Sequence, residues 1–331
     1  MMEMFTEDRQ RGKMDLNEAM TERHSVRMYT DEPVSKALLD DIAAEVERCN
    51  ATSGLHFQMA SGLEDAFCSY KTHYGRFNGV HNAIALVTKI DEPYDLHPAK
   101  KAHSATSDGE NPIKPVTSIK LSSTSCATQS AANPSANLHT IKPVTGVHCA
   151  PDADKPETGT RCHMDSAVQL VDPIPPEEAE IEEKVGYYGE QLALKLVQLG
   201  LATSWAVLDD ATTGWWELEP GEHVVWILAF GHPARAGAKH HSKPLDSLCS
   251  LPASLGPDAT LADSPDWFQR GIAAASLAPT SLSQQPFHFT LEDAQTVSAR
   301  VTPGLFAYVG LGCAKRNFEI GASTDNFEWA K

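Results

Sequence analysis

The sequence has no long apolar run. The longest, at about residues 224–230, has the size of a strand and is far shorter than the roughly 20 residues that span a membrane. Residues 1–13 are largely charged and contain no apolar stretch of the kind found in secretory signals. The seven cysteines are scattered and odd in number, which indicates reduced thiols rather than a disulfide framework. We therefore expect a cytoplasmic protein that does not engage a membrane.

Basic residues are also scarce. The 331 residues include 27 Lys and Arg against 44 Asp and Glu, for a net charge of −17. This balance argues against nucleic acid or an anionic membrane as the main partner, but it allows a local basic pocket for a phosphate group. The length allows one large domain or two ordinary ones. No Ser/His/Asp triad or paired-carboxylate signature stands out, so no catalytic side chain is predicted.

Residues 91–183 lack any sustained helical or strand period. Ser, Thr, Pro, Ala and Asn dominate much of this segment, and the hexamer at residues 113–118 nearly recurs at 141–146. Such a composition cannot bury enough apolar area to offset the entropy of ordering, so we predict a disordered insertion, as well as a flexible leader at residues 1–15. The pairs His148-Cys149 and Cys162-His163 do not have the spacing of a zinc site, and no metal is predicted.

A short basic segment, residues 23–27, is the first candidate binding element. Arg23 and Arg27 lie four residues apart with Ser25 between them. Guanidinium groups bind phosphate oxygens in pairs, and the hydroxyl adds a donor. On a helix the same arginines would be solvated surface charges, and the sequence leaves both interpretations open. Likewise, the aromatic and basic residues 70–79 either line a pocket or form an exposed turn.

Hydrophobic periodicity predicts the regular elements around these segments. Helices are expected at residues 15–21, 34–50, 182–201, 267–277 and 314–320. Strands are expected at residues 55–60, 83–88, 203–208, 222–231 and 287–291. The helix at 182–201 is apolar around much of its circumference, which is typical of a central helix. Ser35 is expected to cap the second helix, and Asp263 or Ser264 the fourth. Residues 232–248 are expected to form a basic linker.

A polar loop between the helix at 267–277 and the strand at 287–291 is the second candidate binding element. Pro279 ends the helix, and small polar residues follow it. Hydroxyls and amides held between a helix end and a strand can present donors and acceptors to a ligand. A polar connector without a ligand is the simpler interpretation of this composition.

Four motifs in order resemble the FMN-dependent nitroreductase family, in its internally duplicated branch. They are RHSVRMYTDEPV near the N-terminus, YYGEQLALKLVQLGLATSWAVL in the middle, APTSLSQQPFHF in the second half and NFEIGASTDNFEW at the end. The resemblance implies an α+β chain with a nitroreductase-like three-layer α/β/α fold, built from two fused, unequal halves as a single-chain pseudo-dimer. Residues 16–90 and 184–235 would form the first half, and residues 236–331 the second.

The resemblance also implies one FMN per chain. In this family FMN lies between two subunits, with an Arg-x-Ser-x-Arg/Lys element from one and a Ser-rich, Gln-Pro loop from the other. The first half of this chain keeps only the former element, at residues 23–27. The second half keeps only the latter, at residues 279–286. A single complete site per chain is therefore expected, and the chain could act as a monomer because it supplies both halves.

The family pattern assigns cofactor-binding residues by position. They are Arg23, His24, Ser25, Arg27, Arg76, Trp205, Ala206, Val207, Leu208, Lys243, Pro279, Thr280, Ser281 and Ser283. Arg23 and Ser25 would hold the phosphate and ribityl chain, and Arg27 would lie near the flavin pyrimidine. Residues 205–208 would approach the ring through their backbone, and the residues after 278 would contact it from the other half. Arg76 and Lys243 are weaker candidates for the pyrimidine side and the phosphate.

The implied activity is ping-pong reduction of a small acceptor, such as a nitroaromatic or a quinone, driven by NAD(P)H. Because the flavin carries the chemistry, no acid or base side chain is required. The alternative is a non-catalytic flavin-binding protein of the same fold. Ser283, Gly310 and Asn317 stand where Asn, an acidic residue and His are common in the family. These departures leave both a retuned and a lost activity open.

Overall fold

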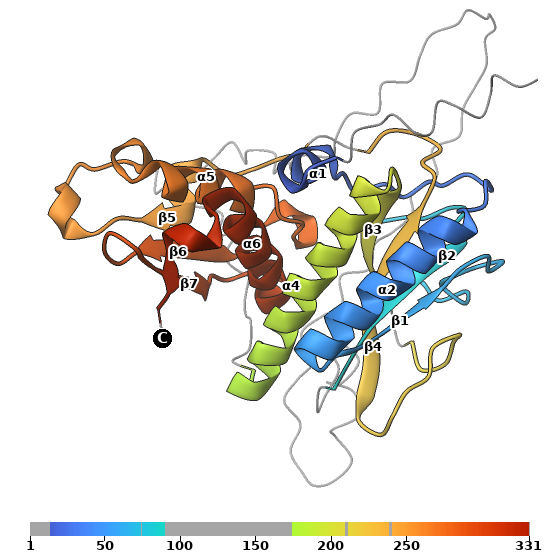
Figure 1. Cartoon of the computed structure of the whole chain (residues 1–331). Coiled ribbons are helices and arrows are strands. Elements are labelled where there is room, and N and C mark those ends of the chain that lie inside the picture. Colours follow the sequence, from blue (N-terminus) through green and yellow to red (C-terminus); the bar gives the residue numbers. More distant parts are fainter. Residues whose placement is uncertain (1–13, 74, 90–173, 209–210, 238–239, 331) are drawn as a thin grey trace, which may run out of the picture. The chain divides into compact units, whose positions relative to one another are not determined.

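The computed structural model describes residues 14–73, 75–89, 174–208, 211–237 and 240–330 (Figure 1). All of them belong to one unit, which comprises residues 1–96 and 164–331. Most of the predicted leader and of the predicted insertion at 91–183 lies outside the described residues. Within the described part of the chain, no helix is both long enough and apolar enough to cross a membrane.

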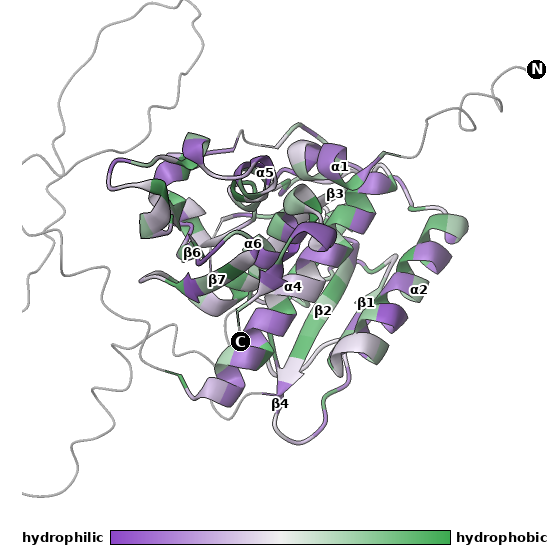
Figure 2. Ribbon diagram, turned by 60° about the vertical axis from the view of Figure 1, so that its left-hand side comes forward, coloured by the Kyte–Doolittle hydropathy of each residue, from purple (hydrophilic) through white to green (hydrophobic). Residues whose placement is uncertain are grey.

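The first sheet has four antiparallel strands in the order β1-β2-β4-β3. They are β1 (His56–Ala60), β2 (Asn82–Lys89), β3 (Ala202–Val207) and β4 (Glu222–Gly231). Strand β2 is buried along its length except at Lys89, and it is the continuous apolar strand in Figure 2. Helices α2 (Lys36–Ser53) and α4 (Pro176–Gln198) pack on one face of this sheet, around Ile42, Leu192 and Phe230.

Loops cover the other face of the first sheet. Phe67 and Trp216 pack there against the alternate residues of β2 and β4. The hydroxyl of Tyr70 accepts hydrogen bonds from the backbone of Thr212 at 3.2 Å and of Thr213 at 3.0 Å, which ties the two loops together. This face is therefore closed by irregular segments rather than by helices.

The second sheet is shorter, with the order β5-β6-β7-β8. Its strands are β5 (Cys249–Ser250), β6 (Phe287–Leu291), β7 (Thr296–Val301) and β8 (Glu328–Trp329). Helices α5 (Asp266–Ala275) and α6 (Ala307–Ala322) pack on it through an aromatic cluster, in which the rings of Phe289 and Phe318 stack at 4.8 Å. The predicted α+β class with two unequal sheet-containing parts is confirmed.

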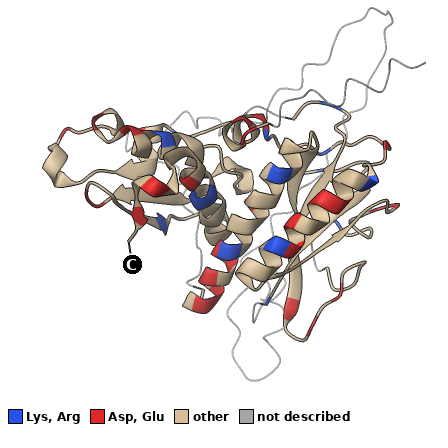
Figure 3. Ribbon diagram, viewed as in Figure 1, with Lys and Arg blue, Asp and Glu red and all other residues tan. Residues whose placement is uncertain are grey.

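Helices α4 and α6 join these two parts (Figure 1). Two glycines allow the helix backbones to touch. A Cβ at Gly186 would lie 2.0 Å from the carbonyl oxygen of Val309, and a Cβ at Gly312 would lie 2.0 Å from that of Glu183. Charged side chains are frequent along α2 and at the N-terminal end of α4 (Figure 3), and Lys315 of α6 forms an ion pair with Glu183 of α4 at the crossing. The short helix α1 (Leu16–Glu22) packs against α4 with Ala19 and Met20.

The predicted helix ends agree with the structure only in part. Ser35 caps α2 as predicted, accepting from the backbone of Leu38. Helix α4 begins at Pro176, earlier than the predicted residue 182, because its first turns are polar and carry no apolar stripe. The predicted cap of α5 is wrong. Pro265 occupies that position, and Asp263 instead closes a capping box with Thr260 on the 3₁₀ turn η5 (Leu261–Asp263).

The remaining short turns connect these elements. They are the 3₁₀ turns η3 (Leu245–Leu248), η4 (Ala253–Leu255), η6 (Ser281–Ser283) and η7 (Thr324–Asn326). The four cysteines that the structure describes, Cys49, Cys68, Cys249 and Cys313, are free thiols.

Candidate functional site

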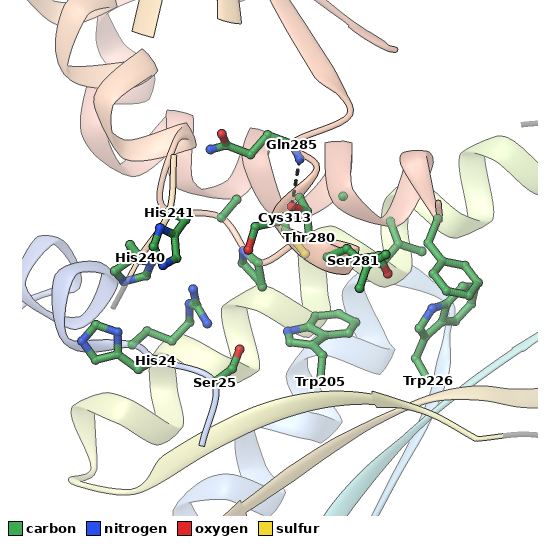
Figure 4. Close-up of a pocket in the computed structure, with 18 of the residues that line it drawn as sticks. His24, Ser25, Trp205, Trp226, His240, His241, Thr280, Ser281, Gln285 and Cys313 are labelled. Carbon is green, nitrogen blue, oxygen red and sulfur yellow. Dashed lines mark hydrogen bonds between the residues drawn. The ribbon is translucent and has the colours of Figure 1, made fainter. Parts of the chain in front are cut away.

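A cavity of about 280 Å³ lies where the two sheet-containing parts meet (Figure 4). Its lining comprises Arg23, His24, Ser25, Arg27, Trp205, Ala206, Val207, Trp226, His240, His241, Ser276, Ala278, Pro279, Thr280, Ser281, Leu282, Ser283, Gln285, Phe306, Val309, Gly310 and Cys313. No carboxylate is among these residues, although the whole chain carries a net charge of −17. The cavity is therefore a cationic and aromatic site within an acidic protein.

The basic segment at residues 23–27 is extended, not helical. Ser25 pairs with Thr203 at the start of β3, and the backbone N–H of Val26 donates to the carbonyl of Thr203 at 2.9 Å. Arg23, His24, Ser25 and Arg27 all line the cavity, while Val26 enters the core. The segment is not a helix, and Arg23 is not a solvated surface charge because it is only 4% exposed, whereas Arg27 is exposed.

Arg23 connects the two walls of the cavity. It follows α1 directly, and its Nη2 donates to the carbonyl of Leu277 at 3.0 Å. Its Nε lies 3.4 Å from a carboxylate oxygen of Glu190, which α4 places beneath the cavity with no solvent exposure. Burial raises the pKa of Glu190 to about 7, and the charge of Arg23 opposes that rise.

Arg27 is held by the loop at residues 70–79. Its guanidinium carbon lies 5.8 Å from the centre of the Phe77 ring. Gly75 has a positive φ of 81°, and a Cβ there would lie 2.7 Å from Nε of Arg27. This loop therefore acts on the site through Arg27. The predicted site residue Arg76 is exposed and does not line the cavity.

The opposite wall is the loop at residues 276–286, between α5 and β6. Gln285 is buried at its base and donates to the carbonyl of Ser276 at 2.8 Å, while its backbone N–H donates to Oγ1 of Thr280 at 3.0 Å. Leu282 and Ser283 have positive φ values of 52° and 55°, a conformation that costs energy for residues other than glycine. The buried glutamine thus fixes a strained loop that presents hydroxyl groups to the cavity.

Lys243 and Leu208 were predicted to take part in the site but do not line the cavity. The ammonium of Lys243 donates to the carbonyl of Gln285 at 3.2 Å, so it supports the loop from behind. Leu208 is buried against the loops that cover the first sheet. The other residues predicted at the site, apart from Arg76, all line the cavity.

The sequence interpretation predicted His24 at the cationic end of the cavity but missed His240 and His241. The rings of His24 and His240 lie 4.7 Å apart, and His241 lies beside them (Figure 4). Burial lowers the pKa of His240, and the nearby charges of Arg23 and His24 lower it further. His240 and His241 belong to the segment expected to be a basic linker. Its adjacent histidines were the available signal.

The far end of the cavity is apolar. Trp226 and Phe306 meet edge to face with ring centres 5.6 Å apart, and Trp205 lies between them and the histidines (Figure 4). Val309 and Gly310 of α6 complete this end. Burial raises the pKa of the Cys313 thiol well above its ordinary value, so this lining residue stays protonated at neutral pH.

The structure brings no metal-binding cluster together in the residues it describes: no group of three or more His, Cys, Asp or Glu side chains could hold an ion there. The pairs His148-Cys149 and Cys162-His163 lie outside the described residues. Among those described, the lining combines hydrogen-bond donors, cationic side chains and flat apolar rings, a composition that suits a planar, anionic ligand.

The sequence places this pocket in a known family. Residues 15–97 and 135–322 match the model of the family described as "Putative TM nitroreductase". The match extends over more than half of the chain, so the chain belongs to this nitroreductase family and to the oxidoreductase class that the family represents. The predicted family resemblance is confirmed. No curated protein matches the chain.

Solved structures from several bacteria are similar to this chain. A "putative nitroreductase" from Thermotoga maritima is 14% identical over 94% of this chain and 84% of that chain, with a TM-score of 0.45. A second nitroreductase so described, from Desulfovibrio desulfuricans in complex with FMN, is 16% identical over 70% and 94%, with a TM-score of 0.34. The "hypothetical oxidoreductase YcnD" of Bacillus subtilis is 14% identical over 70% of this chain and 72% of that chain, with a TM-score of 0.38. The family assignment rests on the sequence match.

Proposed function

We propose that the cavity binds one FMN per chain and that the protein is an NAD(P)H-dependent oxidoreductase that reduces a small acceptor. The observation that carries this proposal is the composition of the cavity, which is cationic at one end and aromatic at the other. A flavin mononucleotide has the matching chemistry, with a phosphate at one end and a flat ring system at the other. A nicotinamide would need only transient access to that ring.

The buried nitrogen atoms at the cationic end fit a phosphate group. Nδ1 of His24 and Nε2 of His240 are buried without a hydrogen-bond partner in the described part of the chain, and Arg23 lines the cavity beside them. Buried polar nitrogens normally find partners, and phosphate oxygens would supply them. Ser25 adds a hydroxyl donor from the same wall. We assign the phosphate to these residues rather than to Lys243.

The other lining residues fit the ring system. When bound, FMN supplies the redox chemistry, accepting a hydride from NAD(P)H and passing electrons to the acceptor. Arg27 would place a positive charge beside the ring, which favours its anionic reduced form. Trp205 offers a flat apolar surface from β3, and Thr280 and Ser281 offer hydroxyls from the second part of the chain.

The order of elements supports a fused pseudo-dimer. The first part of the described chain runs helix, strand, strand, helix as α2-β1-β2-α4, and the second part repeats this order as α5-β6-β7-α6. The two long helices at the ends of these repeats pack against each other. The binding loop is not repeated, since residues 276–286 separate α5 from β6 but only Gly54 and Leu55 separate α2 from β1. This asymmetry favours one site per chain.

The decisive experiment counts the flavin and then tests turnover. FMN would be added to the purified full chain, the excess removed, and bound FMN released and measured per chain by its visible absorption. We expect one FMN, followed by oxidation of NADH or NADPH with a quinone or a nitroaromatic acceptor. Two FMN per chain would contradict the single site, and no binding would reject the flavin assignment. Bound FMN without NAD(P)H oxidation would identify a non-catalytic flavin-binding protein.

A further inference from the structure

The buried carboxylate of Glu190 has no role in the function proposed so far. It is fully buried on α4, directly behind the lining residue Arg23, at 3.4 Å from Nε of that arginine. Neither of its oxygens has a hydrogen bond of good geometry within the described residues. A buried carboxylate without such bonds is costly, so its presence calls for a specific compensating role.

Among the described residues, the charged and titratable groups that influence Glu190 come from the end of α1 and from α6. Arg23 approaches from the end of α1, and Arg316 and the thiol of Cys313 approach from α6. The polar side chains of Asn317, on α6, and Trp205, on β3, also face the carboxylate. Of these groups, only Arg23 forms an ion pair with Glu190 and also lines the cavity. The charge of the carboxylate therefore affects the cavity mainly through its ion pair with Arg23.

Without Glu190, an empty cavity would leave Arg23 as a buried cation with no counter-charge among the lining residues. An arginine cannot shed its proton, so it needs an anion nearby. Glu190 supplies that anion on the side away from the cavity, while the hydrogen bond to Leu277 holds the guanidinium at the lining. A bound phosphate would bring a second anion to the same guanidinium. Two anions around one buried cation repel each other, and the carboxylate can relieve the repulsion by taking up a proton.

We propose that Glu190 is the positioning residue for Arg23 in the empty site and takes up a proton when a phosphate-bearing flavin binds. This inference rests on the proposed flavin site. The reaction is a simple association, in which one proton from solvent joins a carboxylate oxygen as the phosphate joins the guanidinium. No bond within the flavin changes.

The direction of the pH effect follows from the pKa of Glu190, which is about 7 in the ligand-free protein. Below that pH the carboxyl already carries its proton, so binding takes up little from Glu190. Above it the carboxyl is ionised, and the approaching phosphate raises its pKa further. FMN binding should then take up close to one proton at about pH 8, and FMN affinity should fall by up to about tenfold for each pH unit above 7.

The test is calorimetric titration of the full chain with FMN at pH 8, in buffers that differ in their heat of ionisation. The dependence of the measured heat on the buffer gives the protons taken up per FMN. We expect close to one proton for the wild type and a value near zero for Glu190→Gln. Glu45→Gln is the matched control, because Glu45 is also buried against α4 but pairs with Arg48 and Gln191 instead of Arg23. It should keep the wild-type value.

Equal proton uptake by wild type and Glu190→Gln would overturn the inference and assign the proton to the histidines, while leaving the flavin site intact. Absence of FMN binding to the wild type would overturn both. Should Glu190→Gln fail to fold, infrared difference spectra of the wild type provide the same test. Addition of FMN at pH 8 should produce the carbonyl band of a protonated carboxyl group, and a spectrum without that band would refute the proposal.

Discussion

At the scale of single residues, the site depends on two arginines, Arg23 and Arg27, whose positions are fixed by residues outside the cavity lining. Arg23 contacts Glu190 of α4 and the carbonyl of Leu277, and Arg27 lies against Phe77 and Gly75. Each guanidinium is thus oriented by residues that do not themselves line the cavity. Changes in those supporting residues should alter binding without removing any group that touches the ligand.

Glu190 should make stability depend on pH even without a ligand. Its folded-state pKa of about 7 lies above the ordinary value of 4.5, so the folded protein holds this proton more tightly than the unfolded chain. Its stabilising contribution is therefore complete below about pH 4.5 and is lost as the pH rises to about 7. Between these limits the unfolding free energy of the wild type should fall by about 3 kcal/mol relative to Glu190→Gln. Urea unfolding of both proteins at pH 4.5 and 8 measures this difference, and parallel pH profiles would contradict it.

Gly75→Ala should displace Arg27. Gly75 has a φ of 81°, and a Cβ there would lie 2.7 Å from Nε of that arginine. We expect FMN affinity to fall by about tenfold, equivalent to about 1.4 kcal/mol, as measured by fluorescence titration. Gly62→Ala is the matched control, because Gly62 has a φ of 67° but no atom within 4 Å of the added Cβ. Both variants carry backbone strain, and an equal loss of affinity in the control would assign the effect to strain alone.

At the scale of elements, the loop at residues 276–286 is organised by one buried amide. The side chain of Gln285 bonds to the carbonyl of Ser276 and to the backbone N–H of Lys243, which joins both ends of the loop to the preceding segment. Leu282 and Ser283 keep their positive φ values only because these surroundings hold them. The loop should therefore loosen as a unit if the amide is removed.

Gln285→Ala leaves buried backbone groups unpaired and should lower the unfolding free energy by about 1–3 kcal/mol. FMN should also dissociate faster, because the hydroxyls of the loop would no longer be held in place. Gln284→Ala is a close control, since Gln284 accepts a single, exposed bond from the backbone of Leu305. Stopped-flow release of FMN from both variants tests the prediction. Equal release rates would show that Gln285 does not organise the loop.

How far the sequence predicts these elements depends on the strength of each local signal. Strand β4 lies at the predicted residues 222–231, because its continuous apolar run can be buried only in the core. The start of α6 was missed, since glycines at 310 and 312 disguise a helix whose close contact with α4 requires them. His240 and Trp226 reach the cavity from segments that are distant in sequence from residues 23–27. No local pattern reports such a convergence, and only the tertiary structure supplies it.

At the scale of the whole molecule, one chain encloses the proposed binding cavity. Residues 23–27 and 205–207 form one wall, and residues 276–285 form the other. The crossing of α4 and α6 buries the surfaces through which the two parts recognise each other. Two separate subunits are therefore not required to build the cavity, although the family resemblance relates it to a site between subunits.

We predict that the protein is a monomer that binds FMN without a second chain. Light scattering of the FMN-loaded protein should give the mass of one chain, 35.9 kDa, over a wide range of concentration. A subunit-mixing experiment tests the same point at the site itself. Arg23→Ala disables one wall and Gln285→Ala weakens the other, so a mixture of the two variants can regain wild-type affinity only if the walls come from different chains. We expect no recovery on mixing, because each chain closes its cavity internally. Recovery, together with the mass of two chains, would show that the working site lies between molecules.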